Sequence, residues 1–181
     1  MKISVFGGSN PQPDSPAYQE AYQLGNRLGN AGLTVLTGGY TGTMEAASRG
    51  VKEAGGYVIG VTCDEIEAWR PIGPNAWVEE EWRCKTLRER LYTLVEKCDA
   101  AFALPGGVGT LLEICLAWNQ LAIQAIPSKP IILVGEKWQK VMETFYQELG
   151  SYVAMESREY LAFAPDPKDA FELLSHFLKL S

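Results

Sequence analysis

A glycine-rich turn directly follows a run of apolar residues near the middle of the chain. Residues 104–110 read LPGGVGT, and Glu113 follows three residues later. A turn between a strand and a helix exposes the first backbone N–H groups of the helix, and glycines let a ligand approach them. This arrangement is typical of a phosphate site. The alternative is a tight strand-to-helix turn that binds no ligand.

Two more glycine turns, FGGSN (6–10) and TGGYTGT (37–43), also follow apolar runs. The carboxyl ends of parallel strands meet at one edge of a sheet, so we expect all three turns to open on the same edge. Two such turns could hold a nucleotide from two sides. The P-loop motif is absent, and GVGTLL lacks the third glycine of the dinucleotide fingerprint.

Two charged residues near these turns each have a functional and a structural interpretation. Thr110 and Glu113 have the spacing of a capping box, in which the carboxylate only closes the start of a helix. In the functional interpretation, Glu113 reaches a sugar hydroxyl or a water beside the phosphate site. Arg90 is either a solvated helix residue, like Arg83 and Arg88, or a partly buried guanidinium suited to a phosphate or a carboxylate.

The elements that must position these residues alternate along the chain. Ser15 and Pro16 suit the start of a helix that Gly32 ends. Alternation of apolar strands with helices predicts a doubly wound, Rossmann-like α/β fold, one domain over residues 1–181, with a mainly parallel sheet covered by helices on both faces. Strands are predicted at 3–8, 33–39, 57–61, 100–104 and 130–134, with an edge strand at 160–164. Helices are predicted at 14–32, 43–56, 79–97, 110–123, 137–149 and 167–179, and residues 62–78 are predicted to be irregular.

Composition narrows the function classes. The chain has 181 residues and a net charge of −6, which argues against a nucleic-acid-binding face. Four cysteines without CxxC spacing and a single histidine, His176, disfavour a zinc site. We expect Cys98 and Cys115 to be buried free thiols and His176 to lie on the surface. The start MKISVFGG is typical of a strand rather than a signal peptide, and no apolar run reaches membrane-spanning length, so we expect a cytoplasmic protein without membrane partners.

Three segments, TGGYTGTMEAASRGVKEAGGYVIGV (37–61), LRERL (87–91) and DAAFALPGGVGTLLEICLAWNQLAI (99–123), resemble the LONELY GUY (LOG) family. Its members have long been labelled lysine decarboxylase-like. The family motif PGGxGTxxE is matched in full from Pro105 to Glu113, and Arg90 stands nine residues before Asp99, as the second motif requires. Leu91 replaces the lysine of that second motif, and Tyr40 replaces a glycine of the GGGxxG turn. The first half also resembles molybdenum-cofactor carriers, which generally lack the arginine–glutamate pair.

The resemblance implies a phosphoribohydrolase, which cleaves the N-glycosidic bond of a nucleoside 5′-monophosphate such as AMP or an N6-modified AMP. It implies catalytic roles for Arg90 and Glu113, no cofactor and no metal. The residues that it implies for substrate and phosphate binding are Gly39, Thr41, Gly42, Thr43, Met44, Pro105, Gly106, Gly107, Val108, Gly109 and Thr110.

The remaining expectations concern the base, the partners and the alternative functions. Trp69, Trp77 and Trp82 could stack on a purine or pack in a core or an interface. The family implies a homodimer or a larger homo-oligomer. The apolar run at 120–126 could serve as its interface or as part of the core. The alternative function is a non-catalytic carrier or sensor of a phosphorylated ligand. Lysine decarboxylation ranks last, since no lysine lies in a setting suited to pyridoxal phosphate.

Overall fold

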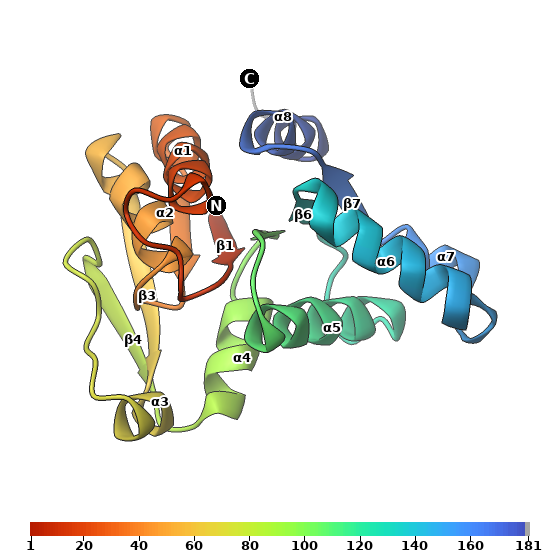
Figure 1. Ribbon diagram of the computed structural model, residues 1–181, viewed down its shortest axis with the longest axis horizontal. Helices are drawn as coiled ribbons and strands as arrows, with labels where there is room; N and C mark the ends of the chain where they lie inside the picture. Colours follow the sequence, from red (N-terminus) through yellow and green to blue (C-terminus); the bar gives the residue numbers. More distant parts are fainter. Residues whose placement is uncertain (180–181) are drawn as a thin grey trace.

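The computed structural model describes residues 1–179; the predicted domain also includes residues 180–181, which lie outside the described residues. Seven strands form one sheet in the order β4-β3-β2-β1-β5-β6-β7, and every neighbouring pair is parallel. The predicted Rossmann-like class is therefore confirmed (Figure 1). The strands are β1 (Lys2–Phe6), β2 (Thr34–Thr37), β3 (Tyr57–Cys63), β4 (Glu80–Cys84), β5 (Ala100–Ala103), β6 (Ile131–Val134) and β7 (Leu161–Ala164).

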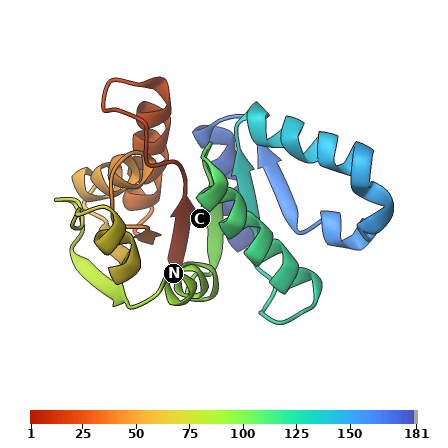
Figure 2. The ribbon, with the colours of Figure 1, turned by 60° about the horizontal axis from the view of Figure 1, so that its bottom comes forward.

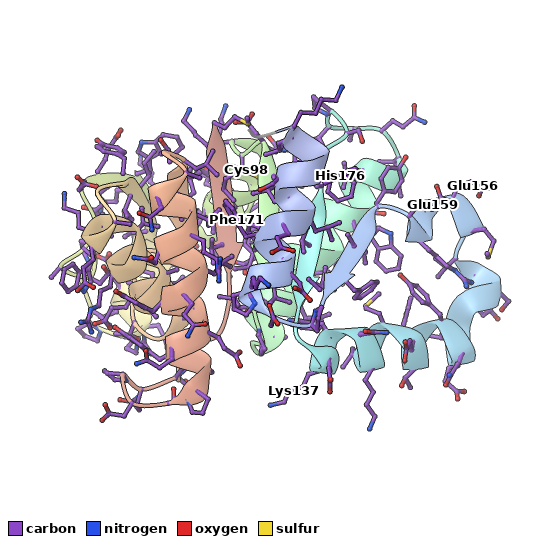
Figure 3. All side chains as sticks on the ribbon, turned by 90° about the horizontal axis from the view of Figure 1, so that it is seen from above. Cys98, Lys137, Glu156, Glu159, Phe171 and His176 are labelled. Carbon is purple, nitrogen blue, oxygen red and sulfur yellow. The ribbon has the colours of Figure 1, made fainter. Side chains whose placement is uncertain are left out.

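Helices cover both faces of the sheet. One buried cluster joins the sheet to α1, α2 and α8, and a second cluster joins its other face to α4, α5 and α6. Figure 3 shows α1 and α8 side by side, and residues of the two helices are in contact. The helices are α1 (Pro16–Asn30), α2 (Thr43–Glu53), α3 (Asp64–Trp69), α4 (Leu87–Glu96), α5 (Val108–Ala122), α6 (Glu136–Leu149), the 3-10 turn η1 (Gly150–Tyr152), α7 (Met155–Arg158) and α8 (Pro167–Leu178).

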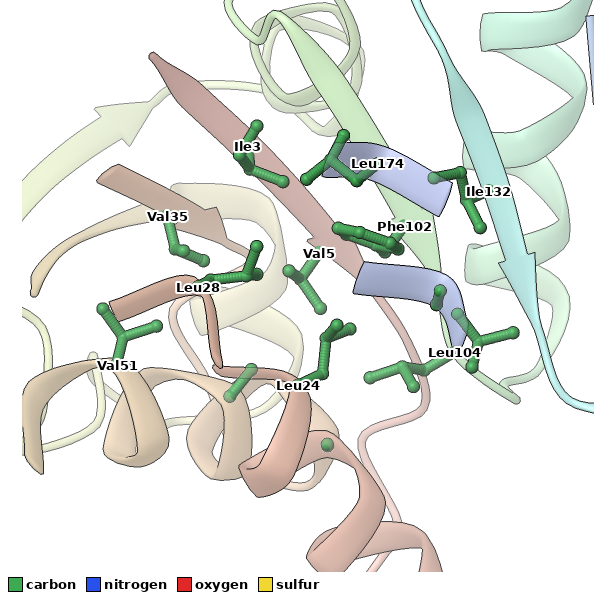
Figure 4. Close-up of a cluster of buried hydrophobic side chains, with 14 of the residues drawn as sticks. Ile3, Val5, Leu24, Leu28, Val35, Val51, Phe102, Leu104, Ile132 and Leu174 are labelled. Atoms are coloured by element: carbon green, nitrogen blue, oxygen red, sulfur yellow. The ribbon is translucent and has the colours of Figure 1, made fainter. Parts of the chain in front are cut away.

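Alternation along the central strands explains the two-layer core. Ile3 and Val5 of β1 point to the first cluster, in which Phe102 of β5 and Leu174 of α8 also pack (Figure 4). Phe6 points to the opposite cluster. A parallel strand covered on both faces must bury both sets of side chains, which is why β1 and β5 read as nearly continuous apolar runs.

The predicted helix at 79–97 is wrong in its first part. Residues Glu80–Cys84 form the edge strand β4, and α4 begins only at Leu87. Trp82 and Cys84 pack against the second cluster, so the segment has the period of two that a strand with one covered face requires. The capping box of α4 lies at Thr86, whose hydroxyl accepts from the Glu89 N–H at 3.2 Å. The region predicted as irregular contains α3 and the end of β3.

Local signals at other termini are confirmed. Ser15 caps α1 by accepting a hydrogen bond from the Tyr18 N–H, and Pro16 occupies the first helical position. β7 lies at the edge of the sheet, as predicted.

The predicted exposure of Cys98 and His176 is confirmed: Cys98 is buried and His176 is exposed. The predicted burial of Cys115 is wrong, because its helix α5 turns that side away from the sheet and leaves Cys115 exposed. His176 lies on α8 (Figure 3). None of the helices described within residues 1–179 has both the length and the apolar character needed to cross a membrane.

Candidate functional site

The topological switch point of the sheet lies between β1 and β5, where the strand order reverses direction. Ligands of doubly wound folds bind at the carboxyl ends of such strands. The three glycine turns meet there, as predicted. The Gly8 N–H donates to the Pro105 carbonyl at 3.2 Å, and the Thr43 N–H donates to the Gly8 carbonyl at 2.9 Å. Thr43 Oγ1 donates to the same carbonyl at 2.8 Å, so backbone bonds join the turns directly.

Gly42 shows why the second turn needs a glycine. Its φ is +75°, in the left-handed region that side chains disfavour. A Cβ atom there would also lie 2.5 Å from the Gly8 carbonyl oxygen. The close approach of the first and second turns therefore depends on the absence of a side chain at residue 42.

A cleft of about 440 Å³ opens beside these turns. Its lining comes from the turns after β1 and β2, from α2, α3 and α4, and from the first turns of α5. Figure 2 shows the ends of β1 and β5 and the start of α5 from below. The residues that line the cleft are Gly7, Gly8, Ser9, Asn10, Tyr40, Met44, Ile66, Trp69, Arg70, Arg90, Gly107, Val108, Gly109, Thr110 and Glu113.

The start of α5 is open to this cleft. Gly107 occupies the N-cap position and supplies no side-chain hydrogen bond to the helix. The first N–H groups of a helix have no partner within the helix, and the helix dipole adds positive potential at this end. Val108, the first helical residue, is 85% exposed. The predicted capping box at Thr110 is wrong, because Gly107 rather than Thr110 is the N-cap of α5. Thr110 lies inside the first turn, buried against Gly106.

Arg90 is buried, with 8% of its side chain exposed, and is held in one orientation. Its Nε donates to the Val61 carbonyl at 2.8 Å, and its Nη2 donates to the Gly38 carbonyl at 3.1 Å. Its Nη1 lies 4.0 Å from Glu113 Oε1. The guanidinium also lies over the Tyr40 ring, 5.7 Å from the ring centroid. These partners direct one edge of the guanidinium to the carboxylate of Glu113.

Gly38 provides the space that Arg90 occupies. A Cβ atom at residue 38 would lie 2.0 Å from Arg90 Nη2 and 2.5 Å from Met44 Sδ. Both distances are far shorter than any non-bonded contact. The turn after β2 therefore requires glycine at two positions. Gly42 allows this turn to approach the first turn, and Gly38 leaves room for the side chain of Arg90.

Glu113 is the buried acid of the site. Its side chain is 9% exposed, and burial raises the pKa of its carboxyl to about 7, against a smaller lowering by Arg90. The distance of 4.0 Å to Arg90 is too long for a direct hydrogen bond, so the ion pair offsets only part of the desolvation cost. A carboxyl group with a pKa near 7 populates both protonation states at neutral pH and is suited to proton transfer.

The predicted site residues fall into three groups. The cleft itself is lined by Met44, Arg90, Gly107, Val108, Gly109, Thr110 and Glu113. Thr41 and Gly42 line a second hollow, which shares Ser9, Asn10 and Arg70 with the cleft. Gly39, Thr43, Pro105 and Gly106 line neither space; Thr43 and Pro105 join the turns through Gly8.

Several lining residues are not among the predicted site residues. Gly8, Ser9 and Asn10 belong to the glycine turn at residues 6–10. Tyr40 had been noted only as a departure from the glycine motif. It is buried: its hydroxyl accepts from the Cys63 N–H at 2.8 Å, and burial raises the pKa of Tyr40 to about 12. Ile66 and Arg70 lie on or next to α3, a helix that had not been predicted.

The three tryptophans have different surroundings. Trp69 lines the cleft and is 80% exposed, so its ring is available to a ligand. Trp82 packs against the core beside α4. Trp77 is partly buried, and the Arg49 guanidinium lies 5.7 Å from its ring centroid. The cleft therefore contains Trp69 and neither of the other two.

Fold and cleft together define a doubly wound α/β protein with a polar cleft at its switch point, containing a buried arginine–glutamate pair. A family model described as the SLOG cluster4 family matches residues 1–162. The chain belongs to this family, and its predicted membership of the LOG family is confirmed.

Named relatives are similar over most of the chain. It is 30% identical to "Cytokinin riboside 5′-monophosphate phosphoribohydrolase LOG7" of Arabidopsis thaliana, covering 97% of this chain and 82% of that protein. It is 31% identical to "Probable cytokinin riboside 5′-monophosphate phosphoribohydrolase LOGL5" of Oryza sativa subsp. japonica, covering 84% of this chain but only 58% of that protein. Among solved structures, the molybdenum cofactor binding protein of Rippkaea orientalis is similar with a TM-score of 0.76 and 27% identity, covering 98% of this chain and 96% of that one.

Proposed function

We propose that the protein is a nucleoside 5′-monophosphate phosphoribohydrolase, which releases a free base and ribose 5-phosphate. The observation that carries the proposal is the buried pair of Arg90 and Glu113 beside the open start of α5. A binding protein needs only the helix start to hold a phosphate, whereas a buried acid with a raised pKa, facing an arginine in a cleft, is typical of a catalytic site. The names of the plant relatives support the same reaction.

In this reaction the C1′–N bond breaks, its electron pair leaves with the base, and the ribose passes through an oxocarbenium-like state. Water then adds to C1′ and loses a proton, and the base gains one. Glu113 lies beside the ribose, where its carboxylate accepts the proton of the water or orients a ribose hydroxyl. Arg90 fixes that carboxylate and limits its protonation at neutral pH.

The phosphate binds at the start of α5, where residues 107–110 present backbone N–H groups. The start of α2 lies next to it, because Thr43 and Gly8 join the first and second turns. Met44 lines the cleft beside Arg90, its Sδ lying 3.9 Å from Arg90 Nη2, and contributes an apolar wall.

The test is release of adenine from AMP and from an N6-modified AMP by the purified protein, followed by chromatography. Glu113→Gln keeps the size of the side chain but removes its charge, and we expect it to lower kcat by at least about 100-fold. Arg90→Ala is expected to lower kcat as strongly. Matched controls are Glu136→Gln, an exposed acid at the start of α6, and Arg88→Ala, an exposed arginine on α4. Wild-type activity in Glu113→Gln would refute the proposed role.

A second function is favoured by one specific observation, the similarity to the molybdenum cofactor binding protein. In this alternative the cleft holds a phosphorylated ligand without cleaving it. Absence of base release from every nucleoside monophosphate, together with a rise in Tm on addition of a phosphorylated ligand, would favour the carrier function. Glu113→Gln would then leave that rise unchanged.

We also propose that the protein acts as a homodimer or larger homo-oligomer and has no nucleic-acid partner. The exposed apolar side chains of Leu112 on α5 and of Ile123 directly after it support the first part. The net charge of −6 supports the second part. Sedimentation analysis tests the first point, and a DNA-binding titration at low salt tests the second.

A further inference from the structure

Arg70 occupies the junction of two spaces at the sheet edge. It follows α3 directly, and its backbone N–H donates to the Ile66 carbonyl at 2.8 Å. Its side chain lines the cleft next to Trp69, and it also lines the second hollow, of about 570 Å³. The helix α4, which carries Arg90, contacts both α3 and α5 and lies between them in Figure 1. Arg70 and residues 107–110 at the start of α5 line the same cleft.

The guanidinium of Arg70 has few partners. Its Nη2 donates to Thr41 Oγ1 across a long 3.4 Å, and its Nε is buried without a hydrogen-bond partner. Within residues 1–179, the arginines that form ion pairs are Arg49, Arg83 and Arg90. A buried donor without a partner is costly for the fold, and a planar guanidinium binds phosphate oxygens through two parallel bonds.

Arg90, the other cation of the cleft, is already bound. Its Nε and Nη2 donate to the carbonyls of Val61 and Gly38, and its Nη1 faces Glu113. Each of the three nitrogens of the Arg90 guanidinium therefore faces a group of the protein. Arg70 is therefore the cationic side chain of the described cleft lining that still has donors for a dianion.

We propose that Arg70 selects phosphorylated substrates by binding the 5′-phosphate of the nucleotide together with the start of α5. The identity of the nucleotide rests on the proposed function. The phosphate lies in the cleft rather than in the second hollow, because residues 107–110 at the start of α5 line the cleft and do not line the second hollow. Thr41 holds the guanidinium at the boundary of the two spaces.

The experiment measures binding, so it does not depend on turnover. Affinities of AMP, ribose 5-phosphate and adenosine are compared by calorimetry for the wild type, Arg70→Gln and Arg70→Lys, with Arg88→Gln as a control on exposed surface. For the AMP measurements, the wild type and each variant also carry Glu113→Gln, so that AMP is not hydrolysed during the titration. We expect Arg70→Gln to weaken the binding of AMP and of ribose 5-phosphate by about 10- to 100-fold and to leave the affinity for adenosine unchanged. Arg70→Lys keeps the charge but loses the paired donors. Its affinity for the two phosphate esters should therefore lie between those of the wild type and Arg70→Gln.

Equal affinities of Arg70→Gln and the wild type for both phosphate esters would overturn the proposal. A parallel loss of adenosine binding would overturn it as well, because Arg70 would then support the cleft rather than select the phosphate. If the wild type releases no base, the proposed function fails, while the comparison of AMP with adenosine still decides the role of Arg70. Retained Tm in Arg70→Lys shows that the fold is intact.

Discussion

Glu113 is predicted to destabilise the folded protein at and above neutral pH. Its carboxyl has an ordinary pKa of 4.5, and burial raises that pKa to about 7. Each tenfold change in proton affinity corresponds to about 1.4 kcal/mol, so this rise corresponds to about 3 kcal/mol. That amount is a large fraction of the free energy of unfolding of a typical domain, which is about 10 kcal/mol.

The sign follows from proton binding. Below about pH 4.5 the carboxyl is protonated in both the folded and the unfolded state, and its burial has no electrostatic cost. Between about pH 4.5 and pH 7 the folded state holds a proton that the unfolded state has lost, so the free energy of unfolding falls as the pH rises. Above about pH 7 the loss is complete. Glu113→Gln cannot ionise and should therefore be more stable than the wild type at pH 8 by up to about 3 kcal/mol.

The assay is urea unfolding of the wild type and Glu113→Gln at several pH values between 4.5 and 8. The difference between the two free energies of unfolding is the measured quantity, because all other titrating groups cancel in it. Glu136→Gln, an exposed acid at a helix start, should show no such pH-dependent difference. If the difference between the free energies of unfolding of the wild type and Glu113→Gln stays constant across this pH range, the argument from burial is refuted.

Three further predictions concern other parts of the site and fold. Gly38→Ala should lower the free energy of unfolding by at least about 2 kcal/mol and reduce base release, because its Cβ would displace Arg90; urea unfolding and the chromatographic assay measure both effects. Trp69→Ala should raise KM for AMP by about 10-fold through lost stacking while leaving Tm unchanged, since the ring is 80% exposed; an unchanged KM would exclude Trp69 from the base site. Ser15→Ala should cost about 1 kcal/mol of stability by removing the cap on the Tyr18 N–H, whereas Ser15→Asp should retain it.

The sequence was a good guide wherever a local signal and the fold agree. Ser15 and Pro16 mark a helix start by chemistry that acts within a few residues, and both positions were predicted. The glycine turns were located because parallel strands bring their carboxyl ends together, whatever the loops contain. The helix predicted over residues 79–97 failed because charged residues dominate β4, and only Trp82 and Cys84 mark its covered face.

The state of Arg90 could not be predicted from its own helix. Arg88 and Arg90 lie on the same short helix, yet one is exposed and the other is buried. The difference comes from the carbonyls of Val61 and Gly38, which lie 29 and 52 residues away along the chain. For Glu113, the capping-box spacing favoured a local role, but α5 begins two residues before Thr110 and leaves the carboxylate facing Arg90.

The hydrogen bonds between the three glycine turns also bear on the kinetics of recognition. Gly8 is bonded both to Pro105 and to Thr43, so loops that are far apart in sequence form one continuous floor. A ligand that docks on such a floor does not have to order separate loops first, and the entropy of arranging them is lost during folding instead. Association should then approach the rate of a rigid encounter, and amide hydrogens of Gly8 and Thr43 should exchange slowly even before any ligand is added.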